Sequence, residues 1–424
     1  MGSDEARLKI AVIGSGIAGI SAAWMLSKRH DVTLLEQDDR LGGHTNTIMV
    51  DEGESVVPVD TGFIVCNERN YPVFYGLLDE WGVSLRDSDM SFGFSCERTG
   101  MGYVGPSLRE FARYPRNFFN PRIWGLVRSQ RRFARRALAS LQRGDLGDTT
   151  LGAYLQDLAM DRFFIENYLV PLAASVWSSP DKDMLDFPAE TFLRFFNNHG
   201  MIQVRDIPRW QTVVGGSCAY IDRFRSLFPG TIKTSTPVRS VAQQAETVLV
   251  TTDQDTPMSF DQVVLATHAD QSLALLSDAT TREKEALSAW RYHRSSVVLH
   301  SDPSVMPPDR RLWASWNYRR PTGAAPGDPV PITYCMNRLQ GLAWTRDYLV
   351  SLNLKAPVDP DHLIYSVEYT HPAYTPACIA AQQQLRAHPA DRRIHFCGSY
   401  MGYGFHEDAA ASAHEVAHRI GDGS

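Results

Sequence analysis

Residues 9–36 read KIAVIGSGIAGISAAWMLSKRHDVTLLE, and this stretch decides the fold. The apolar run 9–14 predicts a buried parallel strand, residues 17–29 predict a helix, and residues 31–36 predict a second strand. A strand, a helix and a strand in this order predict a right-handed βαβ unit. The chain therefore contains an α/β unit built on a parallel sheet.

The turn between the first strand and the helix carries the chemistry. Gly14, Gly16 and Gly19 form a GxGxxG pattern, and Glu36 ends the second strand. Gly14 permits a tight turn, Gly16 lets a pyrophosphate approach the helix N-terminus, and Gly19 lets helix and strand pack closely. Glu36 would accept hydrogen bonds from a ribose diol and repel a 2′-phosphate, which disfavours NADP. The unit therefore predicts a dinucleotide site.

Further segments extend this pattern. RLGGHT (40–45) follows Glu36, and DTGF (60–63) follows an apolar run. IHFCGSYMGYGFHEDA (394–409) predicts a strand, a loop and the start of a helix over 407–420. Two smaller segments are TIKTSTPV (231–238) and DQVVLATH (261–268).

Together these segments resemble the flavin amine oxidase and phytoene desaturase superfamily. The resemblance implies a non-covalently bound FAD, and it places His44 where many members have arginine. GYGFHED (402–408) and WQTVVGGS (210–217) resemble a bacterial branch associated with modified membrane fatty acids. The fingerprint and the resemblance together predict that FAD contacts Gly14, Ser15, Gly16, Ala18, Gly19, Glu36, Gln37, Arg40, Gly43, His44, Thr45, Thr61, Gly62, Phe63, Val238, Ala266, Thr267, Gly398, Ser399, Phe405, His406 and Glu407.

The expected fold class is α/β, a two-domain FAD-binding flavoprotein. Its Rossmann-type cofactor domain would combine residues 1–74, 210–282 and 389–424. A substrate domain of a sheet and long helices would combine residues 75–209 and 283–388, with helical stretches at 107–143 and 150–170. The active site is expected where the two domains meet.

Composition narrows the function classes. The net charge of −6 gives no nucleic-acid footprint at whole-chain level. The six cysteines form no CxxC pair, so neither a metal site nor a disulfide framework is predicted. The apolar stretch 10–26 is interrupted by glycines and is short for a membrane span. We therefore expect a cytoplasmic protein.

Candidates for catalysis are Phe405, Tyr403, Tyr334 and His199, the last because imidazole titrates near neutral pH. Trp177, Phe195, Phe196 and Trp210 are further candidates for an aromatic substrate pocket, although aromatic residues fill cores more often than pockets. His293, His300 and His371 are weaker candidates. Amine oxidases carry a lysine near the flavin, but Lys284 and Lys355, the only lysines after residue 233, lie in polar stretches.

Residues 109–136 contain nine arginines and one acidic residue, with aromatic residues between them. One interpretation is a solvated helical face with a packed apolar side. The other is a surface that touches anionic lipid, which would place the protein peripherally at a membrane.

We therefore expect an FAD-dependent oxidoreductase in which a lipophilic substrate, an acyl chain or a polyene, gives a hydride to flavin N5, as in a desaturase or isomerase. Only one GxGxxG is present, so oxygen or a quinone is the expected acceptor. The alternatives are a flavin amine oxidase that yields imine and peroxide, and an accessory protein that binds FAD without turnover.

Overall fold

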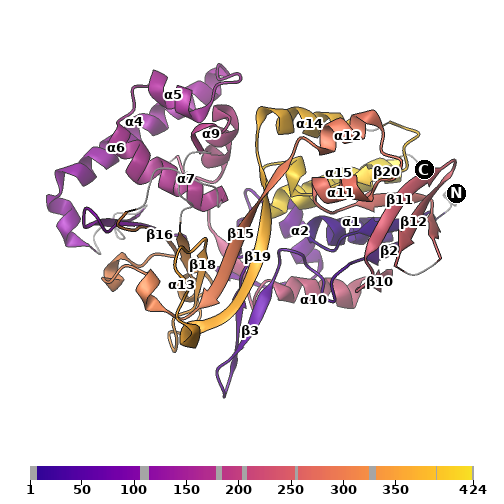
Figure 1. The fold of residues 1–424 in the computed structure, drawn as a ribbon, viewed down its shortest axis with the longest axis horizontal. Coiled ribbons are helices and arrows are strands. Elements are labelled where there is room, and N and C mark those ends of the chain that lie inside the picture. The colour runs from indigo at the N-terminus through magenta and orange to yellow at the C-terminus, as the bar shows by residue number, and fades with distance from the viewer. Residues whose placement is uncertain are drawn as a thin grey trace.

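The structure is a computed structural model of the 424-residue chain. It describes residues 7–105, 114–177, 184–202, 208–253, 256–323, 331–387 and 389–422. Two groups of elements lie on either side of a long pair of strands, β15 and β19 (Figure 1). Helices α4 to α9 gather on one side, and α1, α2, α11 and α15 gather with β2 and β10 on the other.

A parallel five-stranded sheet carries the sequence fingerprint. Its order is β10-β2-β1-β14-β20, and all four pairings are parallel. The expected βαβ unit is β1, α1 and β2, and its strands are buried on both faces, as parallel sheets usually are. The bounds are β1 Lys9–Ile13, α1 Ile17–Ser27, β2 Asp31–Leu35, β10 Thr231–Lys233, β14 Gln262–Leu265 and β20 Ile394–Phe396.

Smaller elements surround this sheet. An antiparallel sheet covers part of it, and helices α1 and α15 pack against each other. The antiparallel strands are β11 Val238–Gln244, β12 Thr247–Thr252 and β13 Met258–Phe260. The helices are α2 Pro72–Glu80, α10 Cys218–Leu227, α11 Ala269–Leu275, α12 Thr281–Leu287, α14 Pro376–Arg386 and α15 His406–Asp422.

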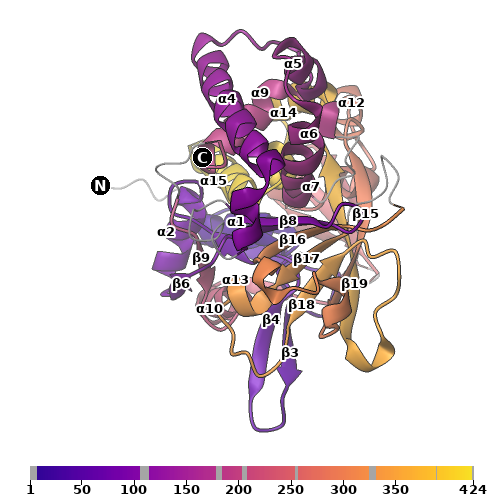
Figure 2. The ribbon, with the colours of Figure 1, turned by 90° about the vertical axis from the view of Figure 1, so that its left-hand side faces the viewer.

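The second group is built on a seven-stranded sheet of order β19-β15-β18-β17-β16-β7-β8. Its strands are β7 Phe92–Cys96, β8 Met101–Gly105, β15 Arg291–His300, β16 Trp316–Arg320, β17 Ile332–Cys335, β18 Leu349–Leu352 and β19 Leu363–Ala373. Helix α13 Met336–Leu339 follows β17. Two small sheets complete the fold. One is the hairpin of β3 Thr47–Asp51 and β4 Val56–Asp60, which projects from the body (Figures 1 and 2), and the other has the order β5 Val65–Cys66, β9 Gln211–Val213 and β6 Leu85–Asp87.

Helix α4 Pro121–Arg143 is the long helix that the arginine-rich segment predicts. Asn120 caps its start, because the Asn120 side chain accepts a hydrogen bond from the backbone N–H of Arg122. The helix ends at Gly144, whose φ of +66° is a left-handed conformation that glycine adopts readily. The remaining helices of this side are α5 Leu151–Asp157, α6 Arg162–Phe164, α7 Val170–Trp177 and α9 Ala189–Asn198.

Two helix predictions need correction. The helix expected over 107–143 is a 3₁₀ turn at Pro115–Phe119 followed by α4, because Pro121 lacks the N–H needed inside a helix but fits a first turn; residues 107–113 lie outside the described residues. The helix expected over 150–170 breaks at Ala159, which has a φ of +45°. In the described residues, no helix has both the length and the apolarity that a membrane crossing needs.

Candidate functional site

The glycine turn has the geometry that its spacing predicts. Gly14 has a φ of +96°, and a Cβ there would lie 2.9 Å from the Ala266 carbonyl oxygen at the end of β14. A Cβ on Gly19 would lie 1.8 Å from the Gly14 carbonyl oxygen. Side chains at these two positions would therefore separate α1 from the turn and from β14.

Gly16 differs from its neighbours because a Cβ there would meet no atom within 4 Å. It is the N-cap of α1, whose first turn has no acidic residue and no capping side chain. The open space therefore borders the positive end of a helix dipole, where an anion is stabilised. Gly43 closes one side of it, since a Cβ on Gly43 would lie 3.3 Å from the Gly16 Cα. This space and its donors fit the diphosphate of FAD.

Glu36 is buried and lies beside the glycine turn. Its carboxylate accepts hydrogen bonds from the Ser15 backbone N–H at 2.8 Å and from the Ser15 hydroxyl at 2.5 Å. The backbone N–H of Asp38 binds the other oxygen at 3.0 Å. A carboxylate has about four acceptor positions, so it retains capacity for a ribose hydroxyl. Glu36 thus fixes the turn as well as fitting its predicted role.

The loop 40–45 is held by its own side chains. The Arg40 guanidinium donates to the Thr45 carbonyl at 3.0 Å and to the Gly43 carbonyl at 2.8 Å. The Thr45 hydroxyl contacts the Tyr220 hydroxyl and lies 3.1 Å from His406 Nε2. Arg40 therefore shapes the loop backbone and places Gly43 beside α1.

His44 belongs to a cluster of aromatic rings that the sequence did not reveal. Its ring stacks on Tyr369 at 4.9 Å between centroids, and it lies 5.7 Å from His268 and 5.5 Å from His371. Tyr369 and His371 lie on β19, whereas His268 precedes α11. Burial lowers the pKa of His44 to about 4 and the pKa of His371 to about 3. These imidazoles are therefore neutral at pH 7 in the flavin-free chain.

The turn after β4 meets the start of α15. Phe63 stacks on His406 with 3.7 Å between centroids, and the Phe63 N–H donates to the His44 carbonyl. The Thr61 hydroxyl donates to the Asn46 carbonyl at 3.0 Å, and a Cβ on Gly62 would lie 1.8 Å from the His44 carbonyl oxygen. The predicted residues 44, 61–63 and 406 are thus neighbours in space.

The closing segment 394–409 folds as predicted, with β20 leading to α15. The Gly398 N–H donates to the Ser412 hydroxyl, and the Ser399 carbonyl accepts from the Tyr374 hydroxyl at 3.3 Å. The Glu407 carboxylate accepts the N–H groups of Val73 and Phe74, so it caps α2 at 3.0 Å for both bonds. Burial raises the pKa of Glu407 to about 7.

Several catalytic candidates form one aromatic cluster, made of Tyr71, Phe195, His199, Trp210, Tyr403 and Phe405. Phe195 stacks on His199 at 3.8 Å and on Phe405 at 4.6 Å between centroids. Trp210 lies 5.9 Å from His199, and Tyr71 lies 6.4 Å from Trp210. The cluster joins the segment before α2, helix α9, the segment before β9 and the loop before α15.

His199 has a defined proton arrangement in this cluster. Its Nδ1 lies 2.9 Å from the Phe195 carbonyl oxygen, which can only accept, so Nδ1 carries the proton. The neutral ring then bears its lone pair on Nε2. Burial lowers the pKa of His199 to about 4, while the bond to Phe195 acts in the opposite direction.

Other candidates lie outside this cluster or at its edge, where the ring of Phe196 lies 6.3 Å from that of Phe195 between centroids. Tyr334 packs edge-on against Trp316 in the seven-stranded sheet, with 4.9 Å between centroids, and Phe196 stacks on Phe192 within α9. His300 bonds Ser351 inside the same sheet. Ala18 is buried in α1, Gln37 is exposed, Val238 begins β11, and Thr267 follows Ala266 beside Gly14. The side chain of Trp177 lies outside the described part of the chain.

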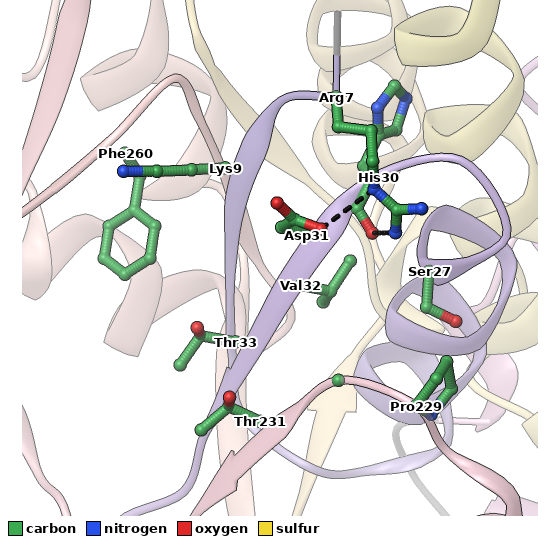
Figure 3. Close-up of a pocket in the computed structure, with 11 residues that line it drawn as sticks. Arg7, Lys9, Ser27, His30, Asp31, Val32, Thr33, Pro229, Thr231 and Phe260 are labelled. Carbon is green, nitrogen blue, oxygen red and sulfur yellow. Dashed lines mark hydrogen bonds and ion pairs between the residues drawn. The ribbon is translucent and has the colours of Figure 1, made fainter.

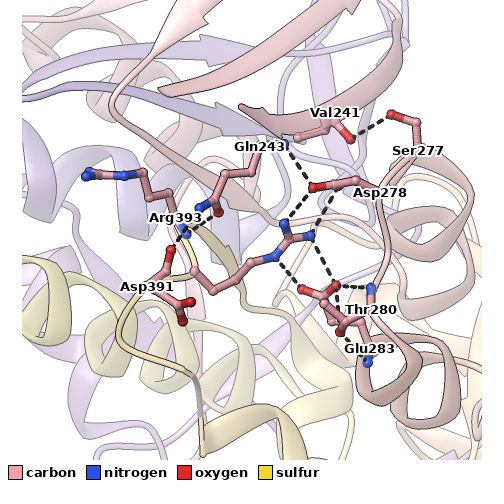
Figure 4. A network of polar contacts seen from close by, with 9 residues as sticks. Val241, Gln243, Ser277, Asp278, Thr280, Glu283, Asp391 and Arg393 are labelled. Carbon is pink, nitrogen blue, oxygen red and sulfur yellow. Dashed lines mark hydrogen bonds and ion pairs between the residues drawn. The ribbon is translucent and has the colours of Figure 1, made fainter. Parts of the chain in front are cut away.

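Two further features lie away from the fingerprint. A pocket of about 350 Å³ is lined by Lys9, Asp31 and Thr231, the first residues of three parallel strands, with the Arg7–Asp31 ion pair at its rim (Figure 3). The glycine turn is at the opposite, carboxyl ends of these strands. A second feature is a polar network in which Arg392 pairs with Asp278 and Glu283, joining the start of α12 to the segment before β20 (Figure 4).

Sequence reasoning missed several residues at the site. Asp60 is buried and accepts from Ser217, Thr47 and Gln340, which anchors the GGS turn of 215–217 to β4. Burial raises the pKa of Asp60 to about 7. His268 gave a signal, since it directly follows the predicted Thr267, whereas Tyr369 gave none.

Comparison with known proteins gives matches of two kinds. The flavin-dependent L-tryptophan oxidase RebO of Lentzea aerocolonigenes is 47% identical over 55 residues, which is 13% of this chain and 12% of that protein. A putrescine oxidase structure has 14% identity and a TM-score of 0.71, covering 98% of this chain and 99% of that one. A fatty acid isomerase from P. acnes that produces CLA has 15% identity and a TM-score of 0.66, covering 99% and 100%. At these identities the structures establish the fold.

The fold is therefore that of two-domain FAD-binding flavoproteins, as the sequence predicted. The chain also matches a protein family over residues 17–324. The match begins directly after the first two glycines of the fingerprint and includes Gly19, the loop 40–45, the hairpin of β3 and β4 and most of the helical side. FAD is the cofactor, and the protein is an FAD-dependent oxidoreductase. The chain belongs to the family of flavin containing amine oxidoreductases.

Proposed function

We propose that this oxidoreductase acts on a lipophilic substrate, an acyl chain or a polyene, as a desaturase or isomerase. The observation that carries the proposal is the aromatic cluster of Tyr71, Phe195, His199, Trp210, Tyr403 and Phe405 beside the start of α15. Five of its members are hydrocarbon-rich rings, and the sixth is a neutral imidazole. Rings of this kind exclude water and would pack against an apolar chain.

The flavin, when bound, supplies the acceptor for a hydride equivalent. The chain supplies orientation and a place for the accompanying proton. His199 suits the second task, because its Nδ1–H is fixed by the Phe195 carbonyl and its Nε2 lone pair can accept. The lowered pKa of about 4 keeps this nitrogen unprotonated at neutral pH.

An amine substrate is favoured less by the charged groups of the site. Lys284 and Lys355 are exposed on α12 and after β18, away from the rings of the cluster. Asp408, three residues after Phe405, accepts the Phe405 backbone N–H at 2.9 Å. Burial raises the pKa of Asp408 to about 6, and its carboxylate already accepts backbone N–H groups of residues 403–405, which leaves less of it for an ammonium group.

Helix α4 supports a lipid source for the substrate. Trp124, Arg128, Arg131 and Arg135 recur at helical spacing along one exposed stripe, and Leu126, Phe133 and Ala137 are buried on the opposite side. At the start of the helix the side chains of Phe119 and Phe118 are 88% and 43% exposed. An exposed stripe of arginines and aromatic rings, in a chain of net charge −6, fits an anionic lipid surface.

The same helix is close to the aromatic cluster. Helix α4 packs against α9, the helix that carries Phe195 and leads to His199, and Figure 2 places α4 at the outer edge of the molecule. The Gln130 amide donates to the Ile202 carbonyl just beyond α9 at 3.3 Å. A lipid held at α4 would therefore be one helix away from the cluster. We include oxygen or a quinone as the acceptor in this proposal.

Anaerobic bleaching of the flavin tests the substrate class. FAD-loaded protein is mixed with fatty acyl lipids, polyenes and simple amines, and flavin absorbance is followed. Bleaching with acyl chains or polyenes alone supports the proposal. Bleaching with amines, followed by peroxide release in air, would replace it with an amine oxidase, and no bleaching with any panel member would favour an accessory protein.

Flotation with vesicles tests the surface of α4. The protein should float with anionic phosphatidylglycerol vesicles at low salt and not with neutral phosphatidylcholine vesicles. At 1 M salt, where the Debye length is about 3 Å, binding should fall. Replacing Arg128, Arg131 and Arg135 by Gln should reduce flotation with FAD content unchanged. Arg310, Arg311 and Arg319 replaced by Gln provide a control of equal charge, and equal loss in both triple variants would contradict a specific surface.

A further inference from the structure

Three histidines from distant segments lie close to one another, and two of them directly follow residues that border the glycine turn. His44 follows Gly43, which contacts Gly16, and His268 follows Thr267, whose side chain would contact a Cβ on Gly14. His371 enters from β19 and lies 5.5 Å from His44 between ring centroids. His44 and His268 are thus one residue from groups that border the glycine turn, and His371 joins them from β19.

The hydrogen bonds of the cluster leave nitrogens for a ligand. The His44 Nε2 lies 3.1 Å from the Thr370 carbonyl oxygen, so Nε2 is the donor and a neutral His44 has a lone pair on Nδ1. The His268 Nδ1 lies 3.3 Å from the Thr370 hydroxyl. The His371 Nδ1 is buried and has no hydrogen-bond partner among the described residues. An unpaired buried nitrogen is costly unless a ligand meets it.

The neighbours of the cluster set its charge. Titratable or charged groups facing it are Arg40 of the loop, His406 of α15, Tyr369 of β19 and Tyr292 of β15, and Tyr292 stacks on His268. None of these neighbours is a carboxylate, so nothing among them competes with an anionic ligand. Burial and the neighbouring histidines lower the pKa values of His44 and His268 to about 4 and that of His371 to about 3.

A diphosphate would change the state of these rings. A neutral His44 whose Nε2–H is bonded to Thr370 can donate to phosphate only after Nδ1 takes up a proton. A nearby anion in a buried site favours the charged imidazole. We propose that His44, His268 and His371 together form the site for the FAD diphosphate, and that FAD binding brings one proton from solvent into this cluster.

This site differs from a single arginine in its response to pH. Arginine stays charged throughout the physiological range, whereas the histidine cluster must take its proton from solvent. If FAD binding takes up one proton, the Kd for FAD rises about tenfold for each unit by which the pH increases. This holds between the pKa of the FAD-free cluster and the pKa of the FAD-loaded cluster. Cofactor retention thereby becomes sensitive to pH.

The test follows FAD release from the loaded protein. Samples at pH 6, 7 and 8 are diluted serially, and the free flavin that passes an ultrafiltration membrane gives the Kd. The Kd of the unmodified protein should rise about tenfold per pH unit over part of this range. His371→Gln should weaken binding about tenfold at pH 6 and flatten the pH dependence.

Two further variants decide the outcome even where His371→Gln fails to fold. His44→Arg should hold FAD with little pH dependence, because the charge is permanent. His414→Gln, on the exposed face of α15, should behave as the unmodified protein. A Kd of the unmodified protein that is independent of pH, or an unchanged pH dependence in His44→Arg, would overturn the proposal. Neither readout requires a substrate, so the result is independent of the proposed function.

Discussion

The glycine turn and the aromatic cluster are built in different ways. The turn uses backbone: Gly14, Gly16 and Gly19 act through the absence of a side chain, within six residues of sequence. The cluster uses side chains from four places, with Tyr71 and Phe405 separated by more than 300 residues. A short pattern can specify the first, whereas only the folded chain assembles the second. Substitutions should therefore separate cofactor binding from substrate handling.

The largest effect is expected at Glu36. Glu36→Arg removes the acceptor of three hydrogen bonds from Ser15 and Asp38, and bonds to a charged group each contribute about 1.5–3 kcal/mol. The protein should therefore lose FAD. The lost hydrogen bonds sum to about 5 kcal/mol or more, divided between the stability of the turn and the binding of FAD. Flavin absorbance per chain after gel filtration measures this. Glu54→Arg, at the exposed tip of the β3–β4 hairpin, is the control, and full FAD content in Glu36→Arg would show that the fingerprint is misassigned.

The second prediction concerns the stability of the flavin-free protein at acid pH. Six described histidines have pKa values lowered to about 3 or 4, namely His44, His199, His268, His300, His371 and His406. Three carboxyl groups, fully or partly buried, have raised pKa values of about 6 or 7, namely Asp60, Glu407 and Asp408. Between pH 4.5 and 6 the unfolded chain thus binds six histidine protons and the folded chain binds three carboxyl protons.

The excess of three protons on the unfolded chain fixes the sign. The free energy of unfolding of the flavin-free protein should therefore decrease as the pH falls from 6 to 4.5, by at most about 4 kcal/mol for each pH unit. Denaturant melts across this range measure it. The free energy of unfolding of the FAD-loaded protein should decrease less over the same range, because the proposed histidine cluster already holds one proton when FAD is bound. Equal slopes for the two forms would argue against that difference.

Gly16→Ala isolates the cofactor side of the comparison. A Cβ there meets no protein atom within 4 Å, and the φ of −61° suits alanine, so the melting temperature of flavin-free protein should stay unchanged. The methyl group would enter the space assigned to the diphosphate, and the Kd for FAD should rise about tenfold, which corresponds to about 1.4 kcal/mol. Titration of flavin-free protein with FAD measures this. An unchanged Kd would mean that the diphosphate lies elsewhere.

Trp210→Phe isolates the substrate side and should have the smallest effect. The ring at this position stacks near His199, so a smaller ring should raise KM for a lipophilic substrate about threefold. FAD content and the spectrum of the bound flavin should not change. Trp316→Phe, next to Tyr334 in the seven-stranded sheet, is the matched control. A larger KM change in the control would move the substrate site toward that sheet.

The sequence predicted the two regions to different extents. The turn at Gly14–Gly19, the placement of Glu36 and the closing strand and helix followed from local patterns, because each depends on neighbours a few residues away. The pairing of His44 with His371 could not follow, since it depends on the register of β19 against β15. Residue type alone indicates Tyr334 as a catalytic candidate, whereas in the structure its ring packs against Trp316. The division at 74, 209, 282 and 388, and the roles of individual site residues, stay predictions.

The long ladder between β15 and β19 also sets how a distant change could reach the cofactor. Val297 pairs with Val367 inside the seven-stranded sheet, and further along the same two strands His293 pairs with His371. Tyr369 and His371 are two residues apart, so both point to one side of the strand. A slip of one residue would turn both away from His44. An insertion or a proline far along β15 or β19 would shift this register, and the protein would then lose flavin although the altered residue touches no flavin atom.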